Sequence, residues 1–493
     1  MNAYIVRNLA MSASALAMFA SASPLFAQTA PQAAAAEENS SMEDIVVTAR
    51  RREESAQSVP ISVTALSGER LQTATVQSLN DLTALAPGIR MSSEGGGGVS
   101  TISLRGLSKT PVGETLPAVV IYFAEVALPN QGVDIPTYDL GNIQVLKGPQ
   151  GTLFGRNTIG GAILMTPQAP TYNFNGYAKA TVGDFNLRAF EAALNVPIIS
   201  DRVALRVAGQ IRRRDGTVNI IDGKDARNIH QQSLRASLLI EPLDGLTNTT
   251  IVDYFDADEI PNPGIIYKNQ VAAFAPTMNA LVAGQNASGR FPAPLSAAGY
   301  LAALGAAADA QIAMGPFKTR QSIPNFITAR ESLGIVNTTR FDLSDNLYIK
   351  NIFGFRKSKL DITSQSDGLP LIFPTTGFQA GLDVLTGGLK SKRELMSNEL
   401  QLQGSTLGGV VDFIAGGIYT EDKPVGAENG NYGPRFQFGG TIAPSVFGPA
   451  LSSFITSKSY AVFGQVGIDL SDIVVSGLKL NLGYRQTWDK IKA

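Results

Sequence analysis

Residues 202–212 read RVALRVAGQIR, and this stretch decides the fold because apolar and polar side chains alternate along it. Its apolar face carries Val203, Leu205, Val207 and Ile211, and its polar face carries Arg202, Arg206, Gln210 and Arg212. The stretch 478–488, LKLNLGYRQTW, repeats the pattern. A strand places successive side chains on opposite faces. Strands of about ten residues with one apolar and one polar face are typical of transmembrane β-barrels.

Similar segments recur from residue 176 onward. Strands are predicted at 177–183, 188–196, 202–213, 231–241, 246–256, 330–342, 347–357, 392–403, 409–420, 458–470 and 478–489. The short connections are 197–201, 242–245, 343–346, 404–408 and 471–477, and the long ones are 214–230, 257–329, 358–391 and 421–457. The connection 184–187 is the one short exception among the long set. Outer-membrane barrels have short periplasmic turns and long outer loops, so this alternation favours a barrel over a soluble sandwich.

We therefore predict that residues 176–493 form the N-terminal half of an antiparallel transmembrane β-barrel, with Tyr460 and Trp488 in an interfacial girdle. About eleven strands are half of the roughly 22 found in plugged outer-membrane transporters. An odd count leaves a sheet edge whose backbone groups cannot be satisfied in lipid. The sequence thus predicts an incomplete barrel that lacks its C-terminal strands.

The N-terminus predicts export from the cytoplasm. A polar start with Arg7 precedes the apolar run 9–20, and Ala27 offers a cleavage site, as in a signal peptide over 1–27. The apolar run is too short to span a membrane. Residues 28–41 are rich in Ala, Gln and Glu without periodicity, which predicts a flexible linker.

Residues 51–170 predict a small α+β unit with short apolar runs. One helix is punctuated clearly: Ser78 and Asp81 have the spacing of a capping box, and Pro87 with Gly88 ends the helix. Gly160 and Gly161 are expected to permit close backbone packing. The Ala-rich stretch 296–313 predicts a short surface helix in the longest loop.

Two further segments resemble a known family. The first consists of Glu43, Asp44, Ile45, Val46, Val47, Thr48 and Ala49. The second is IQVLKGPQGTLFGRNTIGGAI at 143–163, and Leu104-Arg105-Gly106 precedes it. These segments resemble the TonB box and the plug domain of TonB-dependent outer-membrane receptors. The resemblance extends over nearly the whole chain after the signal peptide, and its most specific part is 147–163.

The resemblance implies a gated importer in the Gram-negative outer membrane. Its TonB box, at 42–50, would be pulled by the inner-membrane TonB complex after a small-molecule ligand binds. Physically, a short β-forming segment beside a linker can add as a strand to a partner sheet. The alternative is that 43–49 is an ordinary first strand of the plug. No signalling domain is expected before the box, because only a short linker precedes it.

The resemblance also implies ion pairs between plug arginines and barrel glutamates. Arg105 and Arg156 occupy the motif positions, and Glu399, in a stretch that resembles a family barrel strand, is the expected partner. The alternative is that all three are solvated charges. Two departures from the family pattern concern Tyr122–Val126, which lacks the usual Asp-Gly turn, and Gln144, which replaces an acidic residue. The hairpin at 122–126 is therefore expected to be remodelled.

Composition and motifs argue against an enzyme. The chain has 40 basic and 41 acidic residues, one histidine and no cysteine, so nothing points to nucleic acid, thiolate chemistry or a cofactor. His230 lacks neighbouring ligands. The acidic residues Asp253, Asp256, Asp258 and Glu259 lack defined metal-ligand spacing. Lys147–Gly151 lacks the spacing of a phosphate-binding loop.

We therefore predict a receptor for TonB-coupled uptake of a scarce solute, such as a ferric siderophore, with no catalytic, cofactor or metal site. Its partners would be the TonB complex, the ligand and outer-membrane lipid. The alternatives are a truncated fragment without function, a passive porin-like channel, and, more remotely, a soluble β-rich adhesin or enzyme. The substrate, the oligomeric state and the strand boundaries are not encoded in recognisable motifs.

Overall fold

A computed structural model describes residues 46–492 except 49, 53, 58, 94–99, 109–116, 130–134, 222, 323–325, 366, 427, 439–440, 443–450, 454 and 472. The predicted signal peptide (1–27) and linker (28–41) lie outside the described residues. So do Glu43, Asp44, Ile45 and Ala49 of the segment that resembles a TonB box.

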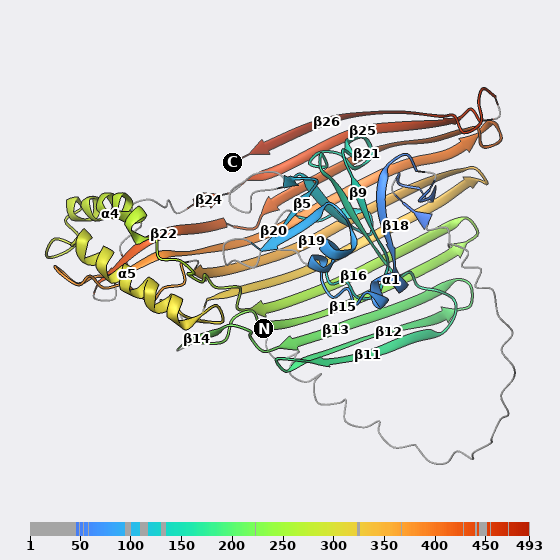
Figure 1. Ribbon diagram of the computed structural model, residues 1–493. Coiled ribbons are helices and arrows are strands. Elements are labelled where there is room, and N and C mark those ends of the chain that lie inside the picture. Colours follow the sequence, from blue (N-terminus) through green and yellow to red (C-terminus); the bar gives the residue numbers. More distant parts are fainter. Residues whose placement is uncertain are drawn as a thin grey trace, which may run out of the picture. The chain divides into compact units, whose positions relative to one another are not determined.

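A large antiparallel sheet dominates the second half of the chain (Figure 1). Its main path has eleven strands, which lie in chain order apart from short strands in the long loops. They are β11 (Asn175–Gly183), β12 (Leu187–Ile199), β13 (Val203–Arg214), β15 (Ile229–Leu243), β16 (Leu246–Glu259), β18 (Ile327–Ser344), β19 (Leu347–Gln365), β20 (Gly381–Thr406), β21 (Val411–Pro424), β25 (Thr456–Asp469) and β26 (Lys479–Lys492). These are the eleven strands that the sequence predicts. Among the described strands, the path runs from β11 to β26 without closing, which confirms the expected partial barrel.

The two faces of this sheet differ as the alternation predicts. On β13, Val207 and Ile211 are 38% and 49% exposed on the outer face, whereas Arg206 and Arg212 are buried on the inner face. Neighbouring strands carry the same pattern because residues paired across an antiparallel ladder share a face. An apolar outer face and a polar inner face suit a sheet with lipid on one side and a polar interior on the other.

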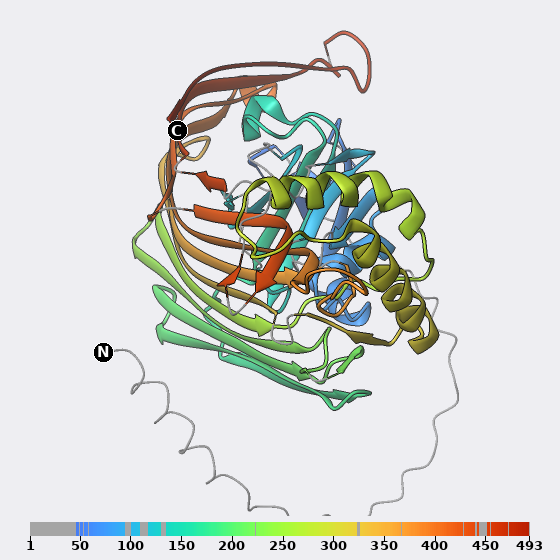
Figure 2. The ribbon, with the colours of Figure 1, turned by 90° about the vertical axis from the view of Figure 1, so that its left-hand side faces the viewer.

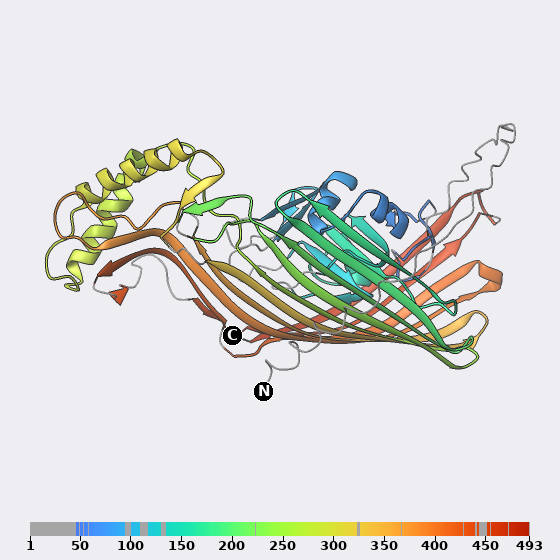
Figure 3. The same cartoon turned by 90° about the horizontal axis from the view of Figure 1, so that it is seen from below.

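The long connections contain their own secondary structure. They hold β14 (Asn219–Ile221), η2 (Val271–Phe274), α4 (Ala275–Ala287), α5 (Ala297–Met314), β17 (Lys318–Arg320), β22 (Glu428–Phe438), β23 (Thr441–Ile442) and β24 (Leu451–Ser453). Helix α5 confirms the helix expected at 296–313. Figure 3 shows α4 and α5 beside the extended ends of β20 and β22, where Met278, Tyr300, Leu382 and Phe436 share one apolar core. None of the helices in the described ranges is long and apolar enough to cross a membrane.

The first part of the described chain forms a smaller α+β unit, which we call the plug. Its central sheet has the order β3 (Ser62–Ser67), β9 (Leu140–Lys147), β10 (Gly161–Pro167), β7 (Val119–Phe123) and β8 (Val126–Ala127). Two smaller sheets are formed by β1 (Val46–Val47) with β2 (Glu54–Ser55), and by β4 (Ile89–Ser93), β5 (Ser100–Leu104) and β6 (Leu107–Ser108). The helices are α1 (Gly68–Thr73), η1 (Leu79–Asp81), α2 (Leu82–Leu85) and α3 (Gly151–Phe154). This composition confirms the predicted α+β class.

The predicted capping box is present in the plug. The Asp81 carboxylate accepts a hydrogen bond from the Ser78 backbone N–H at 2.9 Å, and the Ser78 side chain completes the box. The helix that follows is divided into the 3-10 turn η1 and the single α-helical turn α2. Helix α1, which the sequence did not mark, begins after Ser67, whose hydroxyl accepts from the Arg70 N–H.

The plug packs against the inner face of the large sheet, which curves around it (Figure 2). One apolar cluster joins Phe123 and Ile143 of the plug to Ile251 and Ile352 of the sheet. A second joins Phe154 to Phe463. Each buried side chain of this size contributes about 1.5–3 kcal/mol to stability. These apolar contacts therefore hold the plug against the sheet without involving charged groups.

Gly161 stands where β10 meets both β7 and β9, opposite Val119 and Lys147. A Cβ at this position would lie 2.0 Å from the Leu146 carbonyl oxygen, and the φ of Gly161 is +141°. The close approach that the two glycines were expected to permit is therefore confirmed at Gly161.

We predict that Gly161→Ala lowers the free energy of unfolding by about 1–3 kcal/mol, because the added methyl forces two strands apart. Thermal unfolding of the purified protein in detergent measures this effect. Gly151→Ala is the matched control, since a Cβ there meets nothing within 4 Å. Equal unfolding midpoints for the two variants would contradict the packing argument.

Candidate functional site

Arg51 carries a deeply buried charge at the interface between plug and sheet. Its guanidinium lies 3.3 Å from the Glu399 carboxylate on β20 and 3.5 Å from the Glu125 carboxylate in the plug. It also donates to the Glu125 carbonyl oxygen at 3.0 Å. The Arg51 and Glu399 side chains are 3% and 4% exposed, so water does little to screen this pair.

Aromatic rings and glutamines complete this site. The guanidinium of Arg51 lies 4.6 Å from the ring centre of Phe154 and 5.4 Å from that of Tyr122. Gln403 donates to the Arg51 carbonyl oxygen at 3.2 Å, and Gln401 donates to the Glu399 carboxylate. Burial would lower the pKa of Arg51, but Glu399 and Glu125 outweigh it and raise that pKa. Burial also raises the pKa of Tyr122 to about 12.

Glu125 links Arg51 of the plug to Lys350, a basic residue of the sheet. Its carboxylate lies 2.5 Å from the Lys350 ammonium on β19. Burial alone would raise the pKa of Glu125, yet Lys350 and Arg51 outweigh it and hold that pKa below its ordinary value. The charges therefore alternate from Lys350 through Glu125 and Arg51 to Glu399, so that each ion meets an opposite one.

The hairpin that contains Glu125 is retained, so the remodelling expected at 122–126 does not occur. β7 and β8 still form a two-residue hairpin, with Tyr122 opposite Ala127 and Phe123 opposite Val126. Ala124 and Glu125 occupy the turn with φ of +46° and +71°, a conformation that costs other residues more than glycine. The carbonyl and carboxylate of Glu125 both contact Arg51, and this offsets the cost of the missing glycine.

A second set of charges fixes the plug segment 135–140 to the sheet. The Arg206 guanidinium of β13 binds both carboxylate oxygens of Asp139, at 2.9 and 2.5 Å. Arg235 of β15 donates to the backbone carbonyls of Tyr138 and Asp139, and stacks 5.0 Å from the ring centre of Phe123. A bidentate contact fixes orientation as well as distance, so this segment is held at a defined register on the sheet.

Residues 46–48 of the segment that resembles a TonB box lie against the plug. Val46 and Val47 pair with Ser55 and Glu54, and Val47 is fully buried. The Thr48 backbone N–H donates to the Gln144 side-chain oxygen at 2.9 Å, and the Gln144 amide donates to the Thr48 hydroxyl at 3.3 Å. Gln144, which departs from the family pattern, is thus the residue that ties this segment to β9.

The contacts of the predicted ion-pair residues differ from the expected ones. Glu399 contacts Arg51 rather than Arg105 or Arg156. Arg156 lies 3.2 Å from the Asp489 carboxylate on β26 and donates to the Ser457 hydroxyl. Arg105 donates to the Ser62 hydroxyl within the plug, at 3.2 Å. Two of the three residues therefore join plug to sheet, each with a partner that the sequence did not indicate.

Arg51 and Asp139 are site residues that the sequence did not mark. Arg51 stands in the run Arg50-Arg51-Arg52 directly after the docked segment, and three successive arginines in a plug are a signal for acidic partners. Asp139 has no such signal, because nothing in its sequence neighbourhood distinguishes it from a surface residue.

The acidic residues near the end of β16 serve the sheet. Asp253 binds the Arg356 guanidinium through both oxygens at 2.7 Å, and Glu259 pairs with Arg330. Within the described ranges, no group of three or more metal-ligating side chains lies together. Asp253 and Glu259 therefore belong to ion pairs within the sheet.

The plug region resembles known proteins in sequence. Residues 55–162 match the family described as TonB-dependent Receptor Plug Domain. The pesticin receptor of Yersinia pestis is 31% identical over 154 residues, which are 31% of this chain and 23% of the receptor. The vitamin B12 transporter BtuB of Vibrio vulnificus (strain YJ016) is 31% identical over 129 residues, or 26% of this chain and 21% of the transporter. The matches thus span about a quarter of these relatives' length.

Solved structures with the same fold align with most of this chain. The ferric yersiniabactin uptake receptor FyuA from Yersinia pestis aligns with a TM-score of 0.63 and 16% identity, over 87% of this chain and 61% of that one. The ferripyoverdine receptor of Pseudomonas aeruginosa aligns with a TM-score of 0.62 and 12% identity, over 91% of this chain and 54% of that one. At this identity the likeness shows the fold alone: a plug inside a large antiparallel sheet.

We predict that Arg51→Gln lowers the free energy of unfolding by about 3–5 kcal/mol, because it leaves the Glu399 carboxylate buried without its cation. Denaturant unfolding in detergent measures the change. Arg202→Gln removes an exposed ion pair with Asp244, whose side chain is 96% exposed, and serves as the control. That control should change stability by less than about 1 kcal/mol. Similar losses of unfolding free energy in both variants would contradict a stabilising buried ion pair at Arg51.

A pH dependence follows from the lowered pKa of Glu125. Its pKa in the folded protein lies below the ordinary 4.5, so its ionisation stabilises the fold fully above that pH. This contribution is lost as the pH falls from about 4.5 through the folded-state pKa. Unfolding midpoints measured across this range should fall less steeply for Glu125→Gln than for the natural sequence. Parallel pH profiles would show that Glu125 does not carry the effect.

Proposed function

Because this chain belongs to the TonB-dependent receptor family, we propose that it serves energised uptake of a scarce solute across the Gram-negative outer membrane. The plug would block the channel at rest, and the outer loops together with the upper surface of the plug would bind the solute. A TonB complex of the inner membrane would then pull on residues 43–49. The receptor itself would carry out no covalent chemistry.

The docked segment carries this proposal. β1 has two residues and is held by the ladder to β2 and by the burial of Val47 in an apolar cluster, and the hydrogen bonds between Thr48 and Gln144 follow it. Each hydrogen bond contributes about 0.5–1.5 kcal/mol and the burial of Val47 about 1.5–3 kcal/mol, so detachment costs several kcal/mol, which is within the free energy that ligand binding supplies. A detached β-forming segment has free backbone groups that can pair with a strand of a partner protein.

The position of Arg51 connects this segment to the buried ion pair of Arg51 with Glu399, which joins the plug to β20. Arg51 is three residues after Thr48, and its backbone N–H donates to the Thr48 carbonyl oxygen at 3.0 Å. A force applied at 43–49 would therefore reach the buried pair of Arg51 and Glu399 within a few residues. Breaking that pair would loosen the plug from β20.

The class of solute is proposed from the relatives only. Their names point to a ferric siderophore, with vitamin B12 as a second candidate. Fourteen of the described strands belong to one sheet with long loops at one end, and these loops differ in length and composition from strand to strand. Variable loops on a rigid scaffold are suited to ligand selection.

A passive channel is the alternative function. A porin needs neither a plug anchored by buried charges nor a coupling segment. A truncated receptor without transport activity is a further alternative, and the mass of the protein isolated from native outer membranes distinguishes it from an intact receptor.

We predict that Val47→Pro in the receptor abolishes uptake of radiolabelled ferric siderophores but preserves their binding, because proline cannot donate to a partner strand. Uptake is measured in receptor-deficient cells with and without a protonophore. Retained siderophore binding is the control for a folded receptor. Uptake that survives both Val47→Pro and the protonophore would favour the passive channel.

A further inference from the structure

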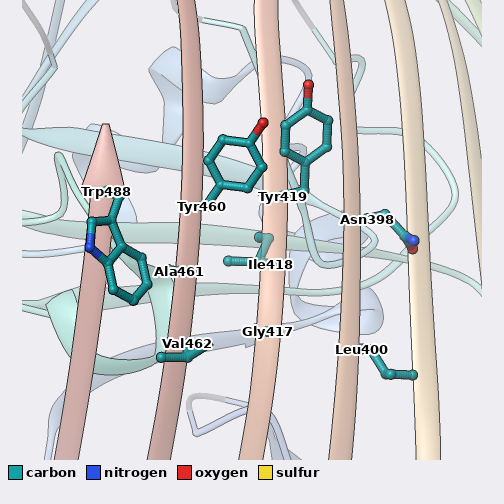
Figure 4. A pocket seen from close by; sticks show the side chains of 9 residues that line it. All are labelled: Asn398, Leu400, Gly417, Ile418, Tyr419, Tyr460, Ala461, Val462 and Trp488. Atoms are coloured by element: carbon teal, nitrogen blue, oxygen red, sulfur yellow. The ribbon is translucent and has the colours of Figure 1, made fainter. Parts of the chain in front are cut away.

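A shallow groove of about 340 Å³ lies on the outer face of the large sheet (Figure 4). It crosses strands β20, β21, β25 and β26 and is lined mainly by apolar side chains. Its floor is Gly417, which pairs with Leu400 on one side and Val462 on the other. Since glycine has no side chain, the outer face is one side chain lower here than at either neighbour.

Three aromatic residues close the groove toward the long loops. Tyr419 pairs with Tyr460, and Tyr460 pairs with Trp488, so the rings form one row across three strands. The Tyr419 and Tyr460 ring centres are 4.9 Å apart. Tyr460 and Trp488 are 50% and 54% exposed. Tyrosine and tryptophan in such a row mark the boundary between hydrocarbon and headgroups, which agrees with the girdle expected for Tyr460 and Trp488.

A charged row follows two residues further toward the long loops, or about 7 Å along the strands. Lys458 and Lys490 face each other directly on β25 and β26. Glu421 faces Lys458 from the other side, on β21, and contacts it at 2.9 Å. Adjacent like charges repel each other, so an additional anion beside Lys458 and Lys490 is favoured.

We propose that this groove binds one phosphate-bearing lipid of the membrane leaflet on the long-loop side. One acyl chain lies over Gly417 between Leu400 and Val462. The aromatic row flanks the upper part of the chain, and the phosphate contacts Lys458 and Lys490. This occupant fits because the groove is lined mainly by apolar side chains and the surface beside it, toward the long loops, carries the facing ammonium groups of Lys458 and Lys490. The inference requires that the sheet spans a membrane and is independent of TonB coupling.

The experiment uses the receptor reconstituted in phosphatidylcholine nanodiscs that contain phosphatidylglycerol with brominated acyl chains. Trp488 is the only tryptophan in this sequence and lines the groove, so bromine on a bound chain quenches its fluorescence. We expect stronger quenching by brominated phosphatidylglycerol than by brominated phosphatidylcholine at equal content. Native mass spectrometry of the same protein counts the lipids that remain bound.

Two sets of variants separate the groove from the basic row. Gly417→Leu fills the groove, and a Cβ at Gly417 meets its nearest atom, the Ala461 carbonyl oxygen, at 3.7 Å, so the strand accepts it. Displacing two or three methylene groups corresponds to roughly 15- to 50-fold weaker lipid retention. Gly464→Leu on the same face is the matched control, where the nearest atom is the Ile414 carbonyl oxygen at 3.5 Å. It should retain the lipid.

The paired change Lys458→Gln with Lys490→Gln should abolish the preference for phosphatidylglycerol and leave quenching by brominated phosphatidylcholine unchanged. Equal lipid retention in Gly417→Leu and Gly464→Leu would overturn the groove as the site. Equal quenching by both brominated lipids in the natural sequence would overturn the phosphate contact.

Discussion

The inner face of the large sheet carries ions that the fold removes from water, and each needs an opposite charge at the right place. A buried ion without a partner costs several kcal/mol, and a well-placed opposite charge offsets much of that cost. The plug supplies the partners from two directions. Arg51 meets Glu399 on β20, and Asp139 meets Arg206 on β13. These two contacts lie on strands that are far apart along the sheet, so together they fix the plug against rotation as well as displacement.

Apolar packing and charge pairing make different contributions to this arrangement. Side chains such as Phe123 and Phe154 pack into clusters with residues of the sheet, and such contacts tolerate small shifts because they have no preferred direction. The bidentate contact of Arg206 with Asp139 tolerates few shifts. The clusters therefore supply most of the adhesion, and the ion pairs set the register. A gate of this kind can be opened by breaking few contacts, provided that they are the directional ones.

The sequence predicts the sheet well because its signals are local. Alternation along 202–212 and the spacing of short and long connections each depend on neighbouring residues, and all eleven strands of the main path follow from them. The capping box at Ser78 and the close approach at Gly161 are local in the same way. The ion pairs are different. Arg51 and Glu399 are 348 residues apart, and only the folded sheet determines which arginine reaches Glu399.

Departures from a family pattern are informative once their contacts are known. Glu125 stands in a turn where glycine would be less strained, and its carboxylate joins Lys350 to Arg51. Gln144 both accepts from and donates to Thr48, and a carboxylate at that position lacks the amide donor that reaches the Thr48 hydroxyl. Sequence comparison alone marks both positions as unusual. The structure shows that both hold the start of the plug in place.

A double-mutant cycle between Arg51→Gln and Glu399→Gln tests the central claim most directly, since it isolates the coupling between plug and sheet from the cost of each truncation. The free energy of unfolding would be measured for the natural sequence, both single variants and the double variant. A buried, directly paired contact predicts a coupling energy of about 1.5–3 kcal/mol. Additive effects of the two substitutions would contradict the claim that this ion pair holds the plug in the sheet.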